Sequence, residues 1–142
     1  MKQKYEMQKK LGGGAFGNVY LILRLRDDQL MAAKHQRLKD ERDKRYARRE
    51  VEILDMMVSD NTDCRENIIQ MIDYYESARE CVILTEYLTG GELFERISSR
   101  HYDLTEAKCK GFMRQVLLGL RYMHNQGRYD DSNTSAALYL QE

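Results

Sequence analysis

Glycine residues near the N-terminus have the spacing of a phosphate-binding loop. Gly12, Gly14 and Gly17 match the pattern G-x-G-x-x-G, with Gly13 between the first two. Glycines allow backbone N–H groups to approach phosphate oxygens because no Cβ atom stands in the way. The pattern alone is weak evidence, since several phosphate-binding folds and many ordinary turns share it.

The residues that follow this loop narrow the choice. A dinucleotide-binding fingerprint requires a helix at its last glycine, whereas residues 19–25 have the β-branched and aliphatic composition of a strand. A Walker A loop requires a lysine and a serine or threonine directly after its last glycine, where Asn18 and Val19 stand instead. Two interpretations stay open: a nucleotide-binding glycine loop between two strands, and an ordinary glycine-rich hairpin.

A lysine and a glutamate further along could form a charged pair. Glu50 follows Ala47 by three residues and precedes Leu54 by four, which places it on the apolar face of a predicted helix. A carboxylate on a buried face is costly unless a cation meets it. Lys34, on the preceding predicted strand, is the natural partner. The alternative, an exposed lysine and a solvated glutamate, would contribute only ~0–1 kcal/mol.

Strands around one helix are predicted for the first half of the chain. Strands are expected at residues 19–25, 29–36, 68–75 and 81–87, with turns at 27–28 and 77–79. In the second of these strands, alternation places Ala32 and Lys34 on one face and Met31 and Ala33 on the other. A helix follows the charged stretch 37–49, with Ala47, Val51, Leu54 and Val58 on its apolar face, and residues 60–63 end it.

Helices are predicted for the second half. Gly90 and Gly91 form the clearest hinge, and a short helix over 93–97 follows it. Thr105 is expected to cap a longer helix. The apolar face of that helix consists of Cys109, Phe112, Met113, Val116, Leu117, Leu120 and Met123.

In this order the motifs resemble the N-terminal lobe of eukaryotic protein kinases. The glycine loop, the segment 31–34 and the segment 49–54 match the glycine-rich loop, the Val-Ala-Ile-Lys element and the αC glutamate of that family. Residues 90–94, Gly-Gly-Glu-Leu-Phe, are especially similar to the calcium/calmodulin-dependent serine/threonine group, which includes myosin light chain and death-associated kinases. The resemblance covers residues 5–127, with 5–89 as the N-lobe and hinge, 90–127 as the start of the C-lobe, and 128–142 as a divergent tail.

The resemblance implies an α+β fold, in which an antiparallel sheet and the αC helix form the N-lobe and the first helices of the C-lobe follow. It also implies ATP as the ligand. Lys34 would hold the nucleotide phosphates, and Glu50 would hold Lys34. Thr85 would be the gatekeeper, backbone groups of Glu86 and Leu88 would bind the adenine edge, and Glu92 would reach the ribose. The other implied ATP-binding residues are Leu11, Gly12, Gly13, Gly14, Ala15, Phe16, Gly17, Val19 and Ala32.

The sequence departs from the family after residue 127. Kinase chemistry requires a catalytic-loop Asp, an Asn for metal and the Asp of Asp-Phe-Gly. Asp131 is a tempting substitute, but no His-Arg-Asp precedes it, and neither Asp-Phe-Gly nor Ala-Pro-Glu occurs. We therefore expect no catalytic Asp and no Mg²⁺ ligands in this chain. An unburied Cys109–Met123 face would forfeit on the order of 10 kcal/mol, so the chain alone should be marginal, aggregation-prone or dependent on a partner.

Composition limits the remaining functions. The 23 Lys and Arg balance the 23 Asp and Glu, so no global field attracts nucleic acid or membrane. A basic cluster over 34–49 is expected to be a solvated surface rather than a binding patch. No apolar run predicts a membrane span or signal peptide, and the scattered Cys64, Cys81 and Cys109 predict neither a disulfide framework nor a metal site.

Three hypotheses follow from these observations. The first is a cytoplasmic serine/threonine kinase of the calcium/calmodulin-dependent type, represented here by an incomplete gene model or a splice product. The second is a non-enzymatic, pseudokinase-like scaffold that binds nucleotide or a docking partner. The third is a truncated product without function. The expected partners are ATP and a protein substrate or docking protein, and no oligomer is evident.

Overall fold

The computed structural model describes residues 4–14, 17–58, 67–99 and 102–125. They belong to two compact units, the first formed by residues 1–55 and 70–87 and the second by 56–69 and 88–142. Predictions for Ala15, Phe16, the loop at 60–63 and the tail fall outside the described residues. The two units are described in turn.

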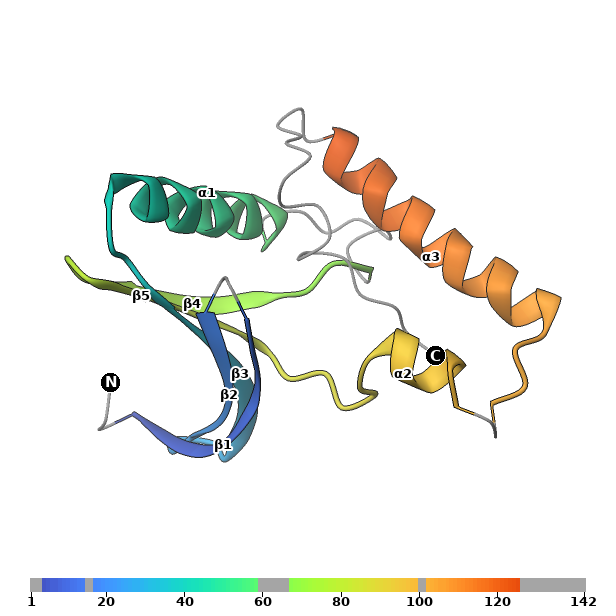
Figure 1. Ribbon diagram of the computed structural model, residues 1–142, viewed down its shortest axis with the longest axis horizontal. Coiled ribbons are helices and arrows are strands. Elements are labelled where there is room, and N and C mark those ends of the chain that lie inside the picture. The colour runs from blue at the N-terminus through green and yellow to red at the C-terminus, as the bar shows by residue number, and fades with distance from the viewer. Residues whose placement is uncertain (1–3, 15–16, 59–66, 100–101, 126–142) are drawn as a thin grey trace. The chain divides into compact units, whose positions relative to one another are not determined.

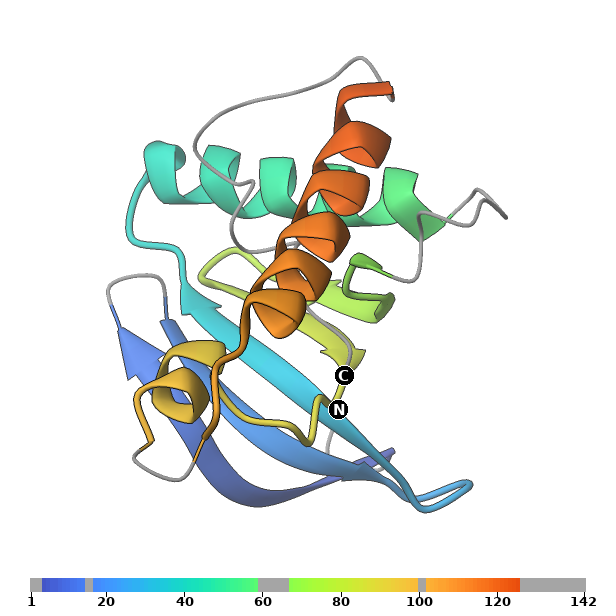
Figure 2. The same cartoon turned by 90° about the vertical axis from the view of Figure 1, so that its right-hand side faces the viewer.

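A five-stranded antiparallel sheet forms the centre of the first unit (Figure 1). Its spatial order is β1 (Tyr5–Gly14), β2 (Gly17–Arg24), β3 (Gln29–Arg37), β5 (Glu80–Glu86) and β4 (Met71–Glu76). Helix α1 (Glu41–Val58) lies beside this sheet in both views (Figure 2). The expected α+β class, an antiparallel sheet with one large helix, is confirmed.

Alternation along β3 divides the side chains between the two faces of the sheet, as predicted. Met31 and Ala33 belong to a buried cluster on one face, together with Ile22, Val82 and Leu84. Three tyrosines, Tyr5, Tyr20 and Tyr75, pack against this cluster. Ala32 and Lys34 take the alternate positions and therefore belong to the opposite face, which is the face that meets α1 through Glu50.

Helix α1 begins with two reciprocal side-chain contacts. The Oδ1 atom of Asp40 accepts a hydrogen bond from the backbone N–H of Asp43 at 2.8 Å. In return, Oδ2 of Asp43 accepts from the backbone N–H of Lys39 at 2.9 Å. This bonding lowers the pKa of Asp40, because the ionised carboxylate is the better acceptor. The arrangement resembles a capping box and fixes where the charged stretch becomes helical.

Three strand predictions need correction. The first strand, β1, includes the glycines Gly12 to Gly14, which were expected to form a loop rather than to pair with a neighbour. Strand β4 begins at Met71 rather than at residue 68, and its pairing with β5 carries an irregularity between Met71 and Asp73. Strand β5 ends at Glu86, one residue before its predicted end.

The second unit contains the short helix α2 (Leu93–Ile97) and the long helix α3 (Glu106–Asn125). Thr105 caps α3 as predicted, since its Oγ1 accepts from the backbone N–H of Lys108 at 3.3 Å. Among the described helices, none is long and apolar enough to cross a membrane.

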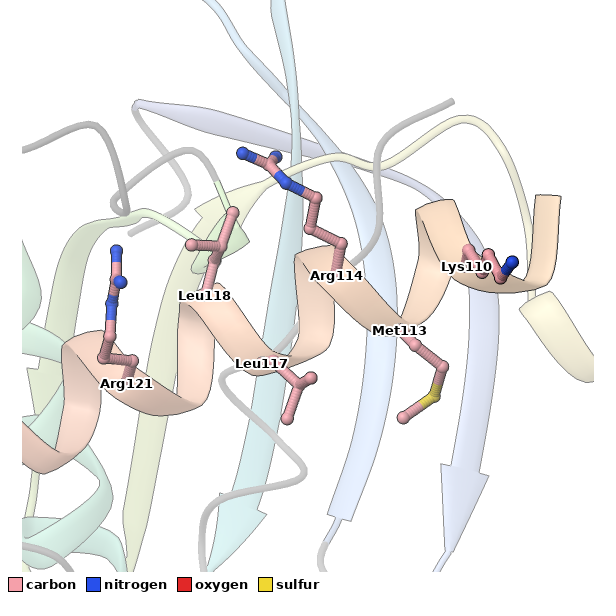
Figure 3. A pocket seen from close by; sticks show the side chains of 6 residues that line it. All are labelled: Lys110, Met113, Arg114, Leu117, Leu118 and Arg121. Atoms are coloured by element: carbon pink, nitrogen blue, oxygen red, sulfur yellow. The ribbon is translucent and has the colours of Figure 1, made fainter. Parts of the chain in front are cut away.

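The apolar face of α3 is buried only near the C-terminal end of the helix. Met123 lies on the buried part, whereas Met113 and Leu117 are 55% and 56% exposed. Figure 3 shows Met113 and Leu117 along one side of α3, and Arg114, Leu118 and Arg121 along another. These residues line a surface depression of about 370 Å³.

Candidate nucleotide-binding site

Strand register brings the predicted site residues of the first unit into one row. Gly12 lies opposite Val19, Val19 opposite Lys34, and Lys34 opposite Ile83. Ala32 lies opposite Thr85 one step along the same face. Residues directly opposite each other in an antiparallel sheet share a face. The pairing of four neighbouring strands, β1, β2, β3 and β5, therefore places the glycine-rich segment, Lys34 and Thr85 relative to one another.

Gly17 must be glycine for reasons internal to the fold. Its φ is +119°, in a region that residues with a Cβ atom rarely adopt. A Cβ atom at this position would also collide with the backbone carbonyl oxygen of His35 on β3. Gly17 thus allows the start of β2 to approach β3 closely.

Gly12 and Gly14 are not explained by packing. A Cβ atom at either position would meet no protein atom within 4 Å among the described residues. Neither residue has a positive φ. The space beside these backbone atoms is open, which is the arrangement that a phosphate group needs in order to reach backbone N–H groups.

Lys34 and Glu50 form the predicted ion pair. The Nζ atom of Lys34 lies 2.6 Å from Oε1 of Glu50, with side chains 25% and 14% exposed, respectively. The helical period places Glu50 on the inner face of α1, beside Ala47, Val51 and Leu54, which are all buried. The pairing expected from the cost of an inward-facing carboxylate is therefore confirmed.

The end of β5 carries the predicted gatekeeper, Thr85, and Glu86, one of the two residues predicted to bind the adenine edge. The hydroxyl of Thr85 donates to the carbonyl oxygen of Glu86 at 3.2 Å. The backbone N–H of Glu86 donates to the carbonyl of Gln70 at 3.0 Å, and its carboxylate accepts from the N–H of Gln70 at 2.8 Å. The carbonyl oxygen of Glu86 accepts from Thr85 with one lone pair and retains a second lone pair for another donor. These bonds fix Glu86 against the segment that precedes β4.

The remaining predicted residues are distributed unevenly. Leu11 lies on β1 and is 39% exposed. Leu88 and Glu92 belong to the second unit, so their parts in the site stay predictions. Ala15 and Phe16 fall outside the described residues.

Sequence reasoning missed one polar residue at this site, Gln36. Its Nε2 donates to Oε2 of Glu50 at 2.7 Å. The alternation that placed Ala32 and Lys34 on one face of β3 places Gln36 on that face too. That periodicity was a sufficient signal to find it.

Comparison with known proteins identifies the family. A model of the protein kinase domain matches residues 5–129. This chain belongs to the protein kinase domain family.

Myosin light chain kinases are among the curated proteins similar to this chain. The chain is 31% identical over 123 residues to smooth-muscle myosin light chain kinase of Gallus gallus, covering 87% of this chain and 6% of that protein. It is 36% identical over 114 residues to myosin light chain kinase family member 4 of Homo sapiens, covering 80% of this chain and 28% of that protein. The predicted resemblance to this group of kinases is confirmed.

Solved structures give the same result. The autoinhibited serine kinase domain of the giant muscle protein titin matches with a TM-score of 0.76 and 26% identity, over 88% of this chain and 37% of that one. The C. elegans twitchin kinase fragment, an autoregulated protein kinase with immunoglobulin domains, matches with a TM-score of 0.78 and 27% identity. The match covers 98% of this chain and 30% of that one. The chain thus spans less than a third of the length of the two curated relatives named above.

Proposed function

We propose that this chain is the ATP-binding part of a serine/threonine protein kinase domain. The Lys34–Glu50 ion pair carries the proposal, because it joins the face of the sheet that bears the glycine-rich segment to the inner face of α1. An ammonium group held there can contact the phosphates of a nucleotide. The family membership and the open space at Gly12 and Gly14 support the same conclusion.

Each of these residues has a defined part in binding. Backbone N–H groups of Gly12 and Gly14 would approach the phosphates, and Lys34 would neutralise their charge. Glu50 holds Lys34 in place rather than touching the nucleotide. The carbonyl of Glu86 has the capacity to accept a hydrogen bond from the adenine amino group. When bound, ATP supplies the phosphoryl group that a complete kinase domain transfers.

We further propose that these 142 residues by themselves transfer no phosphoryl group. The sequence contains neither His-Arg-Asp nor Asp-Phe-Gly, so no group in the family's positions would orient the substrate hydroxyl or hold Mg²⁺. Incubation with Mg·ATP and a basic peptide should give no phosphopeptide. Turnover that disappears in Lys34→Met would contradict this statement.

Calorimetric titration with Mg·ATP tests the binding proposal. Lys34→Met should lower the affinity at least about tenfold, because a charge-assisted contact to phosphate is lost. Lys39→Met removes the same charge from an exposed residue between β3 and α1 and should leave the affinity unchanged. Equal affinities in Lys34→Met and the wild-type chain would refute the proposal and favour a scaffold that does not need nucleotide.

A further inference from the structure

Glu50 is bound through both of its carboxylate oxygens by one strand. Oε1 accepts from Nζ of Lys34 at 2.6 Å, and Oε2 accepts from Nε2 of Gln36 at 2.7 Å. The two donors are two residues apart on β3 and so project from the same face. Because Glu50 comes from α1, this double contact also joins the helix to the strand.

The surroundings of Gln36 would favour an apolar side chain. Gln36 is 9% exposed, and Cys81, directly opposite it on β5, is buried. Its neighbour on the same face, Lys34, lies opposite the buried Ile83. A buried amide is costly unless its hydrogen bonds are made. The contact with Glu50 provides the compensating bond for Gln36 and a second donor for the carboxylate.

We propose that Gln36 is a positioning residue for the nucleotide site. By holding Oε2 of Glu50, Gln36 fixes the last side-chain torsion of the glutamate, which otherwise has a broad range of values. Oε1 is then kept directed at Lys34, and the ammonium group is held where phosphate would meet it. This inference rests on the proposed ATP-binding function.

Gln36 also keeps Glu50 satisfied when Lys34 engages a ligand. An ammonium group that turns toward phosphate weakens its bond to Glu50, whose side chain is only 14% exposed. A carboxylate left there without any donor would be destabilised. With Gln36 in place, one oxygen keeps its partner throughout. Glu50 therefore stays paired while Lys34 contacts phosphate.

Two substitutions separate positioning from packing. Gln36→Leu keeps a similar volume but removes the donor, and should lower ATP affinity about tenfold. Gln36→Glu brings a second carboxyl group beside Glu50. Because like charges raise the pKa of one member of such a pair, the introduced carboxyl should become protonated at mildly acidic pH and then donate as the amide does.

The decisive measurement is a pH profile of ATP affinity from pH 8 to 5.5. The wild-type to Gln36→Glu affinity ratio should be about tenfold at pH 8 and should fall toward one at pH 5.5. Gln29→Leu, an exposed glutamine at the other end of β3, is the matched control and should bind ATP as the wild-type chain does. A ratio that does not change with pH, or Gln36→Leu binding at wild-type affinity, would overturn the inference.

A second readout needs no nucleotide. The rate at which an amine-acylating reagent modifies Lys34, followed by peptide mass spectrometry, should rise about threefold or more in Gln36→Leu, because the freed carboxylate holds the ammonium less firmly. If the wild-type chain fails to bind ATP but this rate rises, the proposed function fails and the positioning contact stands. If ATP binds and the rate is unchanged, the positioning role is refuted and the function stands.

Discussion

Replacing Gly17 with alanine should damage the fold, whereas the same replacement at Gly12 should not. Gly17 has a φ of +119°, and an added Cβ would collide with the carbonyl oxygen of His35. The carbonyl belongs to the backbone of β3, so the contact cannot be relieved by rotating a side chain. Gly12 has no positive φ, and an added Cβ would meet no described protein atom within 4 Å.

The magnitude follows from these two geometries. A non-glycine residue held in a sparsely populated backbone region costs ~1–3 kcal/mol. Moving β2 away from β3 to relieve the collision would weaken the pairing between Asn18 and His35, at about 0.5–1.5 kcal/mol per hydrogen bond. Gly17→Ala should therefore lower the free energy of unfolding by about 2–4 kcal/mol. Gly12→Ala should raise it by up to ~0.5–1 kcal/mol, because glycine is unfavourable within a strand.

Urea unfolding followed by far-ultraviolet circular dichroism measures this difference. Sucrose in all samples strengthens burial and provides a native baseline for a marginally stable chain. With a urea slope of ~1–2 kcal/mol per molar, a loss of 3 kcal/mol lowers the midpoint by roughly 2 M. The reasoning is refuted if Gly17→Ala unfolds within about 0.5 kcal/mol of the wild-type chain, or if Gly12→Ala is destabilised equally.

Three further predictions concern other parts of the chain. Tyr75→Phe should lower the free energy of unfolding by ~0.5–1.5 kcal/mol, since the hydroxyl contacts Tyr5 at 3.4 Å and Asp73 at 2.8 Å. These hydrogen bonds and burial raise the pKa of Tyr75, so the stability that the hydroxyl contributes is present below about pH 10 and is lost as the pH rises above it. Thermal melts of the wild-type and Tyr75→Phe proteins at alkaline pH would show this loss. Burial raises the pKa of Cys81 to about 11, so at pH 8 only about a thousandth of the Cys81 side chains are thiolate. After treatment with an alkylating reagent, mass spectrometry should find Cys81 modified only when the protein has been unfolded. Leu117→Gln, at a 56% exposed position on α3, should reduce light scattering at high concentration and change the melting midpoint little.

The charged pair of the site could be predicted from sequence because two physical requirements coincide. The helical period fixes the direction in which Glu50 points, and the cost of burying a carboxylate demands a cation. Lys34 was the only lysine on the neighbouring predicted strand. Local periodicity and one electrostatic argument were therefore enough to bring together residues sixteen positions apart.

The edges of the sheet could not be predicted as well. Most of β1 is exposed, including Met7, and its pairing with β2 contains irregularities between Met7 and Lys9 and between Lys10 and Gly12. A strand with little burial shows no clean alternation, so its pairing depends on a neighbour rather than on its own sequence. The start of β4 has the same cause, since its ladder with β5 is irregular at Met71.

Gln36 shows how a partly buried charge can lead to further site residues. A carboxylate has two oxygens and about four lone-pair sites, so a single lysine cannot satisfy it once it leaves water. A second donor should therefore be sought wherever such a pair is predicted. On a strand, the positions two residues either side of the lysine share its face, and here those positions are Ala32 and Gln36. Alanine has no side-chain donor, so Gln36 is the residue that this reasoning predicts as the second donor. In the structure its amide nitrogen lies 2.7 Å from Oε2 of Glu50.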